Sequence, residues 1–140
     1  EKVEQEFKER IANILNYQSE VQEPVERRLT KIKDRIKNNL EDVIDSDKID
    51  SNRFEQELVF FLEKLDISEE NSRLKSNCDY FLEVLGGPNS EGKKLGFIAQ
   101  EIGREINTMG SKANDAEVQR LVVKMKDELE KIKEQILNAL

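Results

Sequence analysis

The sequence predicts an all-α protein, and three observations support that prediction. Apolar residues recur at intervals of three and four along most of the 140 residues, which is the period of helices that bury one face. Glycine and proline number only six and two, whereas a sheet protein needs frequent turn residues. Aromatic residues make up 6% of the chain and tryptophan is absent, which favours slender helical packing over a thick core. We therefore expect long antiparallel helices that form a bundle or hairpin.

Residues 1–50 are expected to form a long helical hairpin. A first helix is predicted at about residues 3–21. Pro24 should end it and open a second helix, because proline lacks a backbone N–H and fits best in a first turn. The second helix carries a narrow apolar stripe with spacings of three and four, formed by Val25, Leu29, Ile32, Ile36, Leu40 and Val43. The segment 45–51 is polar and predicts a loop.

Residues 51–140 are expected to form four further helices. Asp50 or Ser51 is the expected N-cap of the first of these and Ser68 that of the second, because their side chains can accept hydrogen bonds from free backbone N–H groups. The glycine-rich segment 86–92 is the one strong break in the chain. It lacks apolar anchors, so we expect it to be the most mobile internal segment.

The last two helices differ in regularity. One is predicted at about residues 94–109, with Gly110 as the left-handed residue that follows it. Asn114 or Asp115 is the expected cap of the final helix. The apolar residues of that helix alternate by four and three, which is typical of a coiled coil or a tight helical hairpin. This C-terminal stripe, which we expect to be buried in part by another helix, consists of Val118, Val122, Met125, Leu129, Ile132 and Ile136.

Composition narrows the possible functions. The net charge is −7, whereas proteins that bind nucleic acid over their whole surface are usually basic. Histidine is absent, which excludes histidine catalysis and histidine metal ligands in this chain. The single cysteine, Cys78, cannot form an intrachain disulfide, and no apolar run approaches the roughly 18 residues of a membrane span. We expect a cytoplasmic protein without a membrane partner.

Polar groups that could perform chemistry concentrate in the segment 91–112. On a helix, Glu101 and Glu105 share a face, with Arg104 beside them and Lys112 further on. Two such carboxylates can hold Mg²⁺ or Mn²⁺, which would activate water and shield phosphate charge in phosphodiester cleavage. Arg104 and Lys112 could hold the phosphate. From spacing alone, ordinary exposed ion pairs are the favoured explanation, because most charged helices carry them.

Two further groups of charged residues precede that segment. Arg53 and Glu57 lie four residues apart on one predicted helix. A second group gathers at the next helix junction and consists of Asp66, Glu69, Glu70 and Arg73. Helix capping and compensation of the helix dipole explain these acids without any catalytic role, because acids are favourable near a helix N-terminus.

Three segments allow a comparison with a known family. Residues 64–76, KLDISEENSRLKS, match the pattern K-x-D-I-x-E-E-x-x-R-L-x-S-H up to its final His. Residues 92–112, GKKLGFIAQEIGREINTMGSK, are similar to G-K-K-L-D-F-x-x-Q-E-x-x-R-E-x-N-T-x-x-S-K. Residues 126–138, KDELEKIKEQILN, are similar to K-x-E-L-E-K-I-R-E-Q-x-x-N. In that order the patterns are those of the C-terminal domain of the YicC-like endoribonucleases, which the chain resembles from residue 53 to its end, while residues 1–50 match only as a long-helix region.

The resemblance implies a cytoplasmic, bacterial endoribonuclease that depends on Mg²⁺ or Mn²⁺, acts on RNA and assembles as a homo-oligomer, a hexamer in the full-length protein. It also implies an N-terminal domain, so that residues 1–140 would be the C-terminal helical domain. That expectation agrees with a sequence that opens inside a helical pattern without Met. Candidate catalytic residues are then Glu101, Arg104 and Glu105. Candidate metal ligands are Glu57, Asp66, Glu70, Glu101 and Glu105. Candidate contacts to RNA phosphates are Arg53, Arg73 and Lys112.

The chain departs from the family patterns at two positions. Asn77 stands where the family has His, and Gly96 stands where it has Asp. Asparagine cannot carry a proton at neutral pH, so a proton-transfer role of that His has no equivalent here. Two other functions remain as alternatives: a non-catalytic helical oligomerisation domain, driven by the C-terminal stripe, and an RNA-binding module without cleavage.

Overall fold

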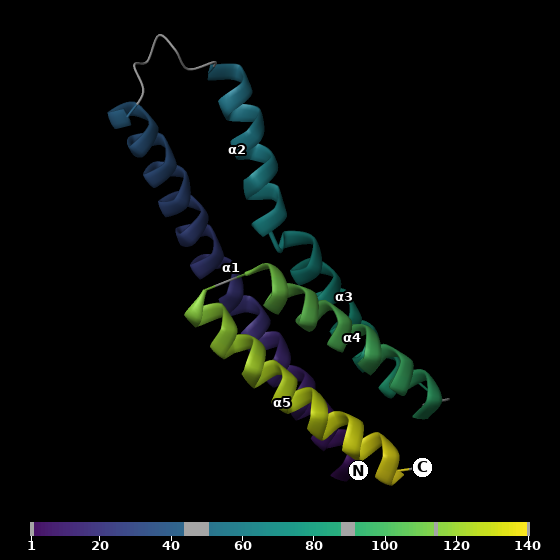
Figure 1. Ribbon diagram of the computed structural model, residues 1–140. Coiled ribbons are helices and arrows are strands. Elements are labelled where there is room, and N and C mark those ends of the chain that lie inside the picture. The colour runs from purple at the N-terminus through teal and green to yellow at the C-terminus, as the bar shows by residue number, and fades with distance from the viewer. Residues whose placement is uncertain (1, 44–50, 88–91, 114, 140) are drawn as a thin grey trace.

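The computed structural model describes residues 2–43, 51–87, 92–113 and 115–139. Those residues form five helices: α1 (Lys2–Val43), α2 (Ser51–Leu65), α3 (Ser68–Leu85), α4 (Gly92–Lys112) and α5 (Ala116–Ala139) (Figure 1). No strand occurs in any of the four described stretches, so the all-α prediction is confirmed.

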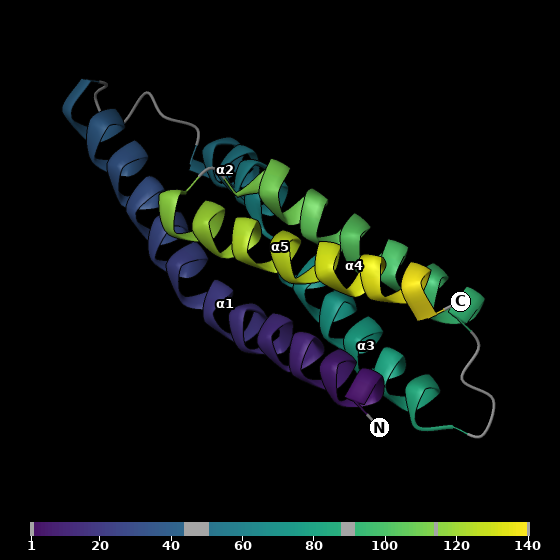
Figure 2. The ribbon, with the colours of Figure 1, turned by 90° about the horizontal axis from the view of Figure 1, so that it is seen from below.

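Four of the helices form a bundle (Figure 2). The first half of α1 packs against α5 and α3, and α4 packs against α3 and α5. Neighbours run antiparallel, so the start of α1 and the end of α5 lie at the same end of the molecule (Figure 1). The second half of α1 extends beyond the bundle together with α2 (Figure 1), and we call residues 26–43 of α1 together with α2 the arm.

The first helix is continuous, and this corrects the prediction that Pro24 divides residues 1–50 into a hairpin. A proline inside a helix removes one backbone hydrogen bond and costs about 3 kcal/mol. Val21 and Val25 flank Pro24, and all three side chains are buried. Burial of each valine contributes about 1.5–3 kcal/mol, so packing of this stripe offsets the cost of the proline.

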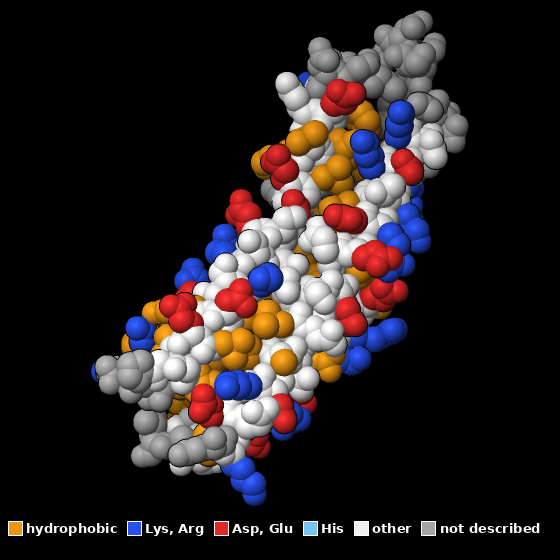
Figure 3. Space-filling model, turned by 180° about the vertical axis from the view of Figure 1, so that it is seen from behind, with side chains coloured by type: hydrophobic (Ala, Val, Ile, Leu, Met, Phe, Trp, Pro, Cys, Tyr) orange, Lys and Arg blue, Asp and Glu red, His pale blue; other side chains and the backbone are white. Residues whose placement is uncertain are grey.

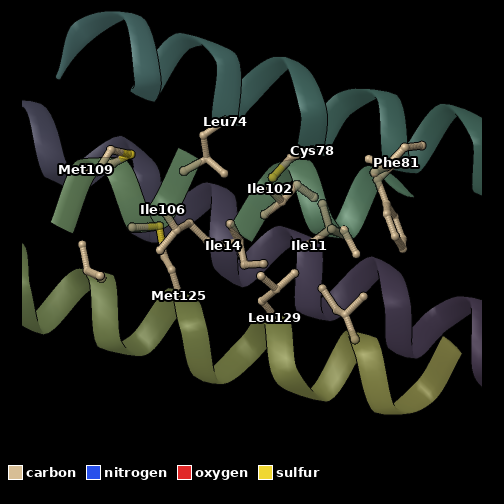
Figure 4. Close-up of a cluster of buried hydrophobic side chains, with 14 of the residues drawn as sticks. Ile11, Ile14, Leu74, Cys78, Phe81, Ile102, Ile106, Met109, Met125 and Leu129 are labelled. Atoms are coloured by element: carbon tan, nitrogen blue, oxygen red, sulfur yellow. The ribbon is translucent and has the colours of Figure 1, made fainter. Parts of the chain in front are cut away.

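The core is one apolar cluster between α1, α3, α4 and α5 (Figure 4). Side chains from all four helices converge in it, and the rings of Phe7 and Phe81 meet edge to face with their centroids 5.7 Å apart. Every residue of the C-terminal stripe is buried, which confirms that prediction. The stripe packs within the chain, against α1 and α4.

The start of α3 differs from the predicted cap. The helix begins at Ser68, and Ile67 occupies the N-cap position without a side-chain hydrogen bond. The carboxylate of Asp66 caps the helix instead. Its Oδ1 accepts hydrogen bonds from the Ser68 backbone N–H at 2.9 Å and from the Ser68 hydroxyl at 2.6 Å. The acid outcompetes the hydroxyl because its charge complements the positive end of the helix.

The end of α4 also corrects a prediction. Gly110 is not a left-handed terminal residue, because the helix continues to Lys112. No glycine among the described residues has a positive φ. A Cβ at Gly110 would lie 3.2 Å from Cγ1 of Val122, so the glycine lets α5 approach closely. The predicted cap at Asp115 is confirmed, since its Oδ1 accepts from the backbone N–H of Glu117 at 2.8 Å.

Several predictions fall wholly or partly outside the described residues. They concern most of the polar segment 45–51, most of the segment 86–92, and the cap candidates Asp50 and Asn114. None of the helices in the described stretches is long and apolar enough to cross a membrane.

Candidate functional site

A group of charged side chains joins the start of α3 to the end of α4. It consists of Glu70 and Arg73 from α3 and Glu105 and Lys112 from α4, and we call it the polar cluster. Nζ of Lys112 lies 2.6 Å from Oε1 of Glu70. Nε of Arg73 donates to Oε1 of Glu105 at 3.1 Å, and Nη2 of Arg73 lies 3.7 Å from Oε1 of Glu70. Antiparallel packing of α3 on α4 thus brings together residues that are 32 and 42 positions apart in sequence.

The carboxylates of the polar cluster are buried, and its cations reach solvent. The Glu70 and Glu105 side chains are 4% and 10% exposed, against 53% and 35% for Arg73 and Lys112. A buried carboxylate is costly unless positive charge and hydrogen bonds compensate it. Arg73 and Lys112 supply both, and in return the carboxylates fix the two cations at the surface. Cations held in this way are suited to bind a phosphate.

The neighbouring carboxylates stabilise the positive charge of Arg73. Its hydrogen bond and its attraction to the Glu105 carboxylate raise the pKa of the guanidinium above its ordinary value, and Glu70 and Glu69 act in the same direction. Arg73 therefore carries its positive charge at neutral pH. It can meet a phosphate with the planar pair of N–H donors that distinguishes arginine from lysine.

Two buried oxygens next to this cluster lack hydrogen-bond partners among the described residues. They are Oε2 of Glu70 and Oδ1 of Asn71. An unsatisfied buried oxygen costs about 1–3 kcal/mol. Carboxylate and amide oxygens are also the ligands that hard divalent cations prefer. Sequence reasoning missed Asn71, although a polar residue on the stripe of Leu74 and Cys78 is the signal that could have found it.

The structure does not bring Glu101 into the polar cluster. Glu101 and Arg104 are exposed, and the side chain of neither forms a hydrogen bond or ion pair with the described part of the chain. Glu105 is buried because it lies on the side of α4 that packs against α3. Glu101 and Glu105 thus lie on one face of α4, Glu105 at its buried edge and Glu101 at its exposed edge. No group of three or more acidic or cysteine side chains suited to a metal occurs in the described stretches.

The other candidates lie apart from the polar cluster or act locally. Arg53 and Glu57 pair with each other on α2 at 3.4 Å, and both are exposed. Asp66 caps α3, as the capping interpretation of this acid expects. Glu69 is 85% exposed and lies 3.5 Å from Arg73, at the rim of the polar cluster.

Comparison with known proteins places the chain in a class and then among particular relatives. The family model described as "Endoribonuclease YicC-like, C-terminal" matches residues 21–139. The chain therefore belongs to the YicC-like endoribonuclease family. It is 39% identical over 132 residues to a "Probable endoribonuclease YicC" of Clostridioides difficile (strain 630), a match that covers 94% of this chain and 43% of that protein. It is also 34% identical over 90 residues to a protein of the same name from Haemophilus influenzae (strain ATCC 51907 / DSM 11121 / KW20 / Rd), covering 64% of this chain and 31% of that protein. The chain spans less than half the length of these relatives.

Proposed function

We propose that this chain is part of a divalent-metal-dependent endoribonuclease in which the polar cluster engages the scissile phosphodiester of RNA. Arg73 and Lys112 would contact the phosphate. Glu70 and Glu105 would hold these two cations and contribute oxygens to Mg²⁺ or Mn²⁺. The observation that carries the proposal is a pair of solvent-accessible cations held by two buried carboxylates, in a chain that belongs to a family of endoribonucleases.

The donor chemistry of the polar cluster fits a hard divalent cation. Glu70 keeps one buried carboxylate oxygen without a partner in the described structure, and Asn71 adds an amide oxygen. Magnesium at phosphoryl-transfer sites usually takes only one or two carboxylates from the protein and keeps several waters. When bound, Mg²⁺ or Mn²⁺ would supply an activated water and neutralise phosphate charge.

The side chains of the cluster have distinct tasks in this proposal. The two N–H donors of Arg73 would orient the phosphate, and Lys112 would offset its charge. The chain has no histidine, and carboxylates also serve as general bases, so we propose a carboxylate as the proton acceptor. We assign that role to Glu105, whose Oε1 accepts a hydrogen bond from Arg73 and whose Oε2 accepts none from the residues that the structure describes.

The test compares two adjacent acids in the full-length protein. Glu70→Gln removes the charge of a buried carboxylate, and Glu69→Gln removes the same charge from the exposed neighbouring residue. We expect Glu70→Gln to weaken Mn²⁺ binding at least about tenfold, as loss of a charged ligand would, and to abolish cleavage of end-labelled RNA. Glu69→Gln should preserve both.

Mn²⁺ binding is measured by calorimetry, and helicity is checked by circular dichroism. Wild-type Mn²⁺ affinity and cleavage in Glu70→Gln would refute the assigned site. Should Glu70→Gln fail to fold, Glu105→Gln provides the second test of the same two quantities.

A non-catalytic assembly role is the second candidate, because the charges of the polar cluster already balance. Two carboxylates face two cations, as in an ion-pair network that only fastens α3 to α4. Val59 and Phe60 on α2 expose 52% and 61% of their surface, which would suit contact with another copy of the chain. A full-length protein that forms homo-oligomers by light scattering yet cleaves no RNA with Mn²⁺ would favour this role.

A further inference from the structure

The second half of α1 concentrates positive charge that the proposed site does not use. Between residues 27 and 37, six residues are basic and one is acidic, in a chain with a net charge of −7. All six basic side chains are exposed: Arg27, Arg28, Lys31, Lys33, Arg35 and Lys37. Such a local excess does nothing for the fold, because like charges on neighbouring turns repel each other. It indicates a surface that meets a polyanion.

Part of this charge borders a hollow of about 270 Å³ between α1 and the start of α5. Four basic residues line the hollow, and we call them the basic groove: Arg27, Arg28, Lys31 and Arg35. Arg27 pairs with Glu117 at 2.9 Å. The other three form no ion pair with any residue in the described stretches. Seen from behind, the arm presents Lys and Arg side chains beside exposed apolar ones (Figure 3).

A second hollow, of about 200 Å³, links the basic groove to the polar cluster. It shares Arg28, Ile32 and Asp115 with the first hollow, and its lining includes Lys112. Lys112 is the residue whose Nζ lies 2.6 Å from Glu70. The two hollows therefore adjoin one another, and together they reach from the basic side of α1 to Lys112, the proposed phosphate contact. Apolar residues of α1, α2 and the α4–α5 connection line the rest of it: Val25, Leu29, Leu65 and Ala113.

We propose that the basic groove guides a single strand of RNA along α1 to the polar cluster; this inference rests on the proposed function. Arg28, Lys31 and Arg35 follow one another at intervals of three and four, so they form a row about 10 Å long on one face of the helix. A row of cations follows a phosphate backbone instead of binding one phosphate. The apolar lining nearer Lys112 suits unstacked bases, which only a single strand presents.

The experiment measures binding of a short fluorescein-labelled oligouridylate to the full-length protein by anisotropy, with a chelator present to prevent cleavage. The groove variant carries Arg28→Gln, Lys31→Gln and Arg35→Gln. The control variant removes three exposed lysines that line neither hollow, with the changes Lys8→Gln, Lys75→Gln and Lys131→Gln. Both lose the same charge, so net charge alone cannot separate them.

We expect the groove variant to bind at least about tenfold more weakly. Its plot of log affinity against log salt should be shallower by about 2, since each lost single-strand phosphate contact removes about 0.7 from the slope. The control variant should keep the wild-type slope, and both variants should keep wild-type Mn²⁺ binding.

Each other outcome rejects a different part of the inference. Wild-type affinity and slope in the groove variant, with cleavage intact, would overturn the groove and leave the proposed function standing. Equal losses of RNA affinity in both variants would mean that only net charge matters, and would overturn the proposed groove. Binding of a duplex as tightly as the single strand would overturn the choice of strand. A wild-type protein that neither binds nor cleaves RNA would overturn both proposals.

Discussion

The two halves of α1 have the same apolar spacing but different surroundings. In the bundle half, Ile11 and Ile14 are completely buried. In the arm, Leu29 and Ile32 are only partly covered. The bundle half lies inside the bundle, whereas the arm half, among the described residues, meets only α2, the start of α5 and the connection that precedes α5. A three-and-four spacing therefore specifies a helix and its apolar face, but the depth of burial depends on neighbours that the spacing does not identify.

Charge follows the same division along α1. From residue 2 to residue 26 there are six acidic and three basic residues, whereas residues 27–37 contain one acidic and six basic residues. The bundle half is held by apolar contacts and tolerates either sign on its outer face. The arm half combines partial burial with unbalanced positive charge, which is typical of a surface kept for binding. In our proposal, stability and RNA recognition are thus separated along one helix.

Thiol reactivity should show the largest difference between bundle and arm. Burial in the bundle raises the pKa of Cys78 to about 12, so only about one molecule in 10,000 carries the thiolate at pH 8. A cysteine introduced by Thr30→Cys on the exposed side of the arm is expected to react with a disulfide reagent at least about 1,000-fold faster. The two rates appear as separate phases in one time course. Similar rates would mean that the bundle opens as readily as the arm.

The next largest difference between bundle and arm is expected in the stability lost when an isoleucine of each is truncated to alanine. Ile14→Ala removes a fully buried side chain from the bundle, and we expect it to lower the free energy of unfolding by about 3–4 kcal/mol. Ile32→Ala changes a half-buried side chain of the arm and should cost about 1 kcal/mol or less. Urea denaturation at an unchanged m-value measures both. A cost for Ile32→Ala that approached that of Ile14→Ala would show that the arm is covered by something in solution.

Catalysis should separate two acids on α4 by a factor of about 100 or more. Glu105→Gln alters the buried carboxylate that holds Arg73, and loss of a proton acceptor or metal ligand typically lowers the rate 100- to 10,000-fold. Glu101→Gln alters an exposed acid four residues away and should leave cleavage within about twofold if the polar cluster is the active centre. Initial rates with Mn²⁺ on labelled RNA decide between them. Loss of cleavage in Glu101→Gln alone would move the centre to the exposed face of α4.

The spacing of apolar residues predicted much of this fold. A helix whose other faces carry charged residues can bury only its one apolar stripe. The C-terminal stripe illustrates this, since spacing alone located all six of its buried residues. Pro24 shows the limit of local sequence rules, because the gain from packing Val21 and Val25 outweighs the local penalty.

The polar cluster could not be assembled from the sequence. Its four residues were all candidates, but spacing grouped Glu105 with Glu101. The partners of Glu105 and Glu70 lie 32 and 42 positions away in the sequence, across a helix pair whose packing no local pattern encodes. Burial then distinguishes the two acids of α4, and burial is a property of the assembled bundle.

The smallest contrast concerns two glycines of α4. Both are helical, and glycine inside a helix costs about 0.5–1 kcal/mol relative to alanine. A Cβ at Gly96 would meet nothing within 4 Å, so Gly96→Ala should stabilise the protein by about that amount. A Cβ at Gly110 would lie 3.2 Å from Cγ1 of Val122. Valine is stiff at χ1 in a helix, so it cannot turn away, and α5 would have to shift at a cost of about 1–3 kcal/mol.

We therefore expect Gly110→Ala to destabilise the protein by about 0.5–2 kcal/mol, after the gain in helix propensity is subtracted. Urea midpoints of the two variants, compared at equal m-values, give the difference directly. Equal stabilisation by both alanines would mean that α4 and α5 lie further apart near Gly110 than the structure shows. Since Lys112 lies only two residues further along α4, that result would also loosen the position of the cation that joins the polar cluster to the basic groove.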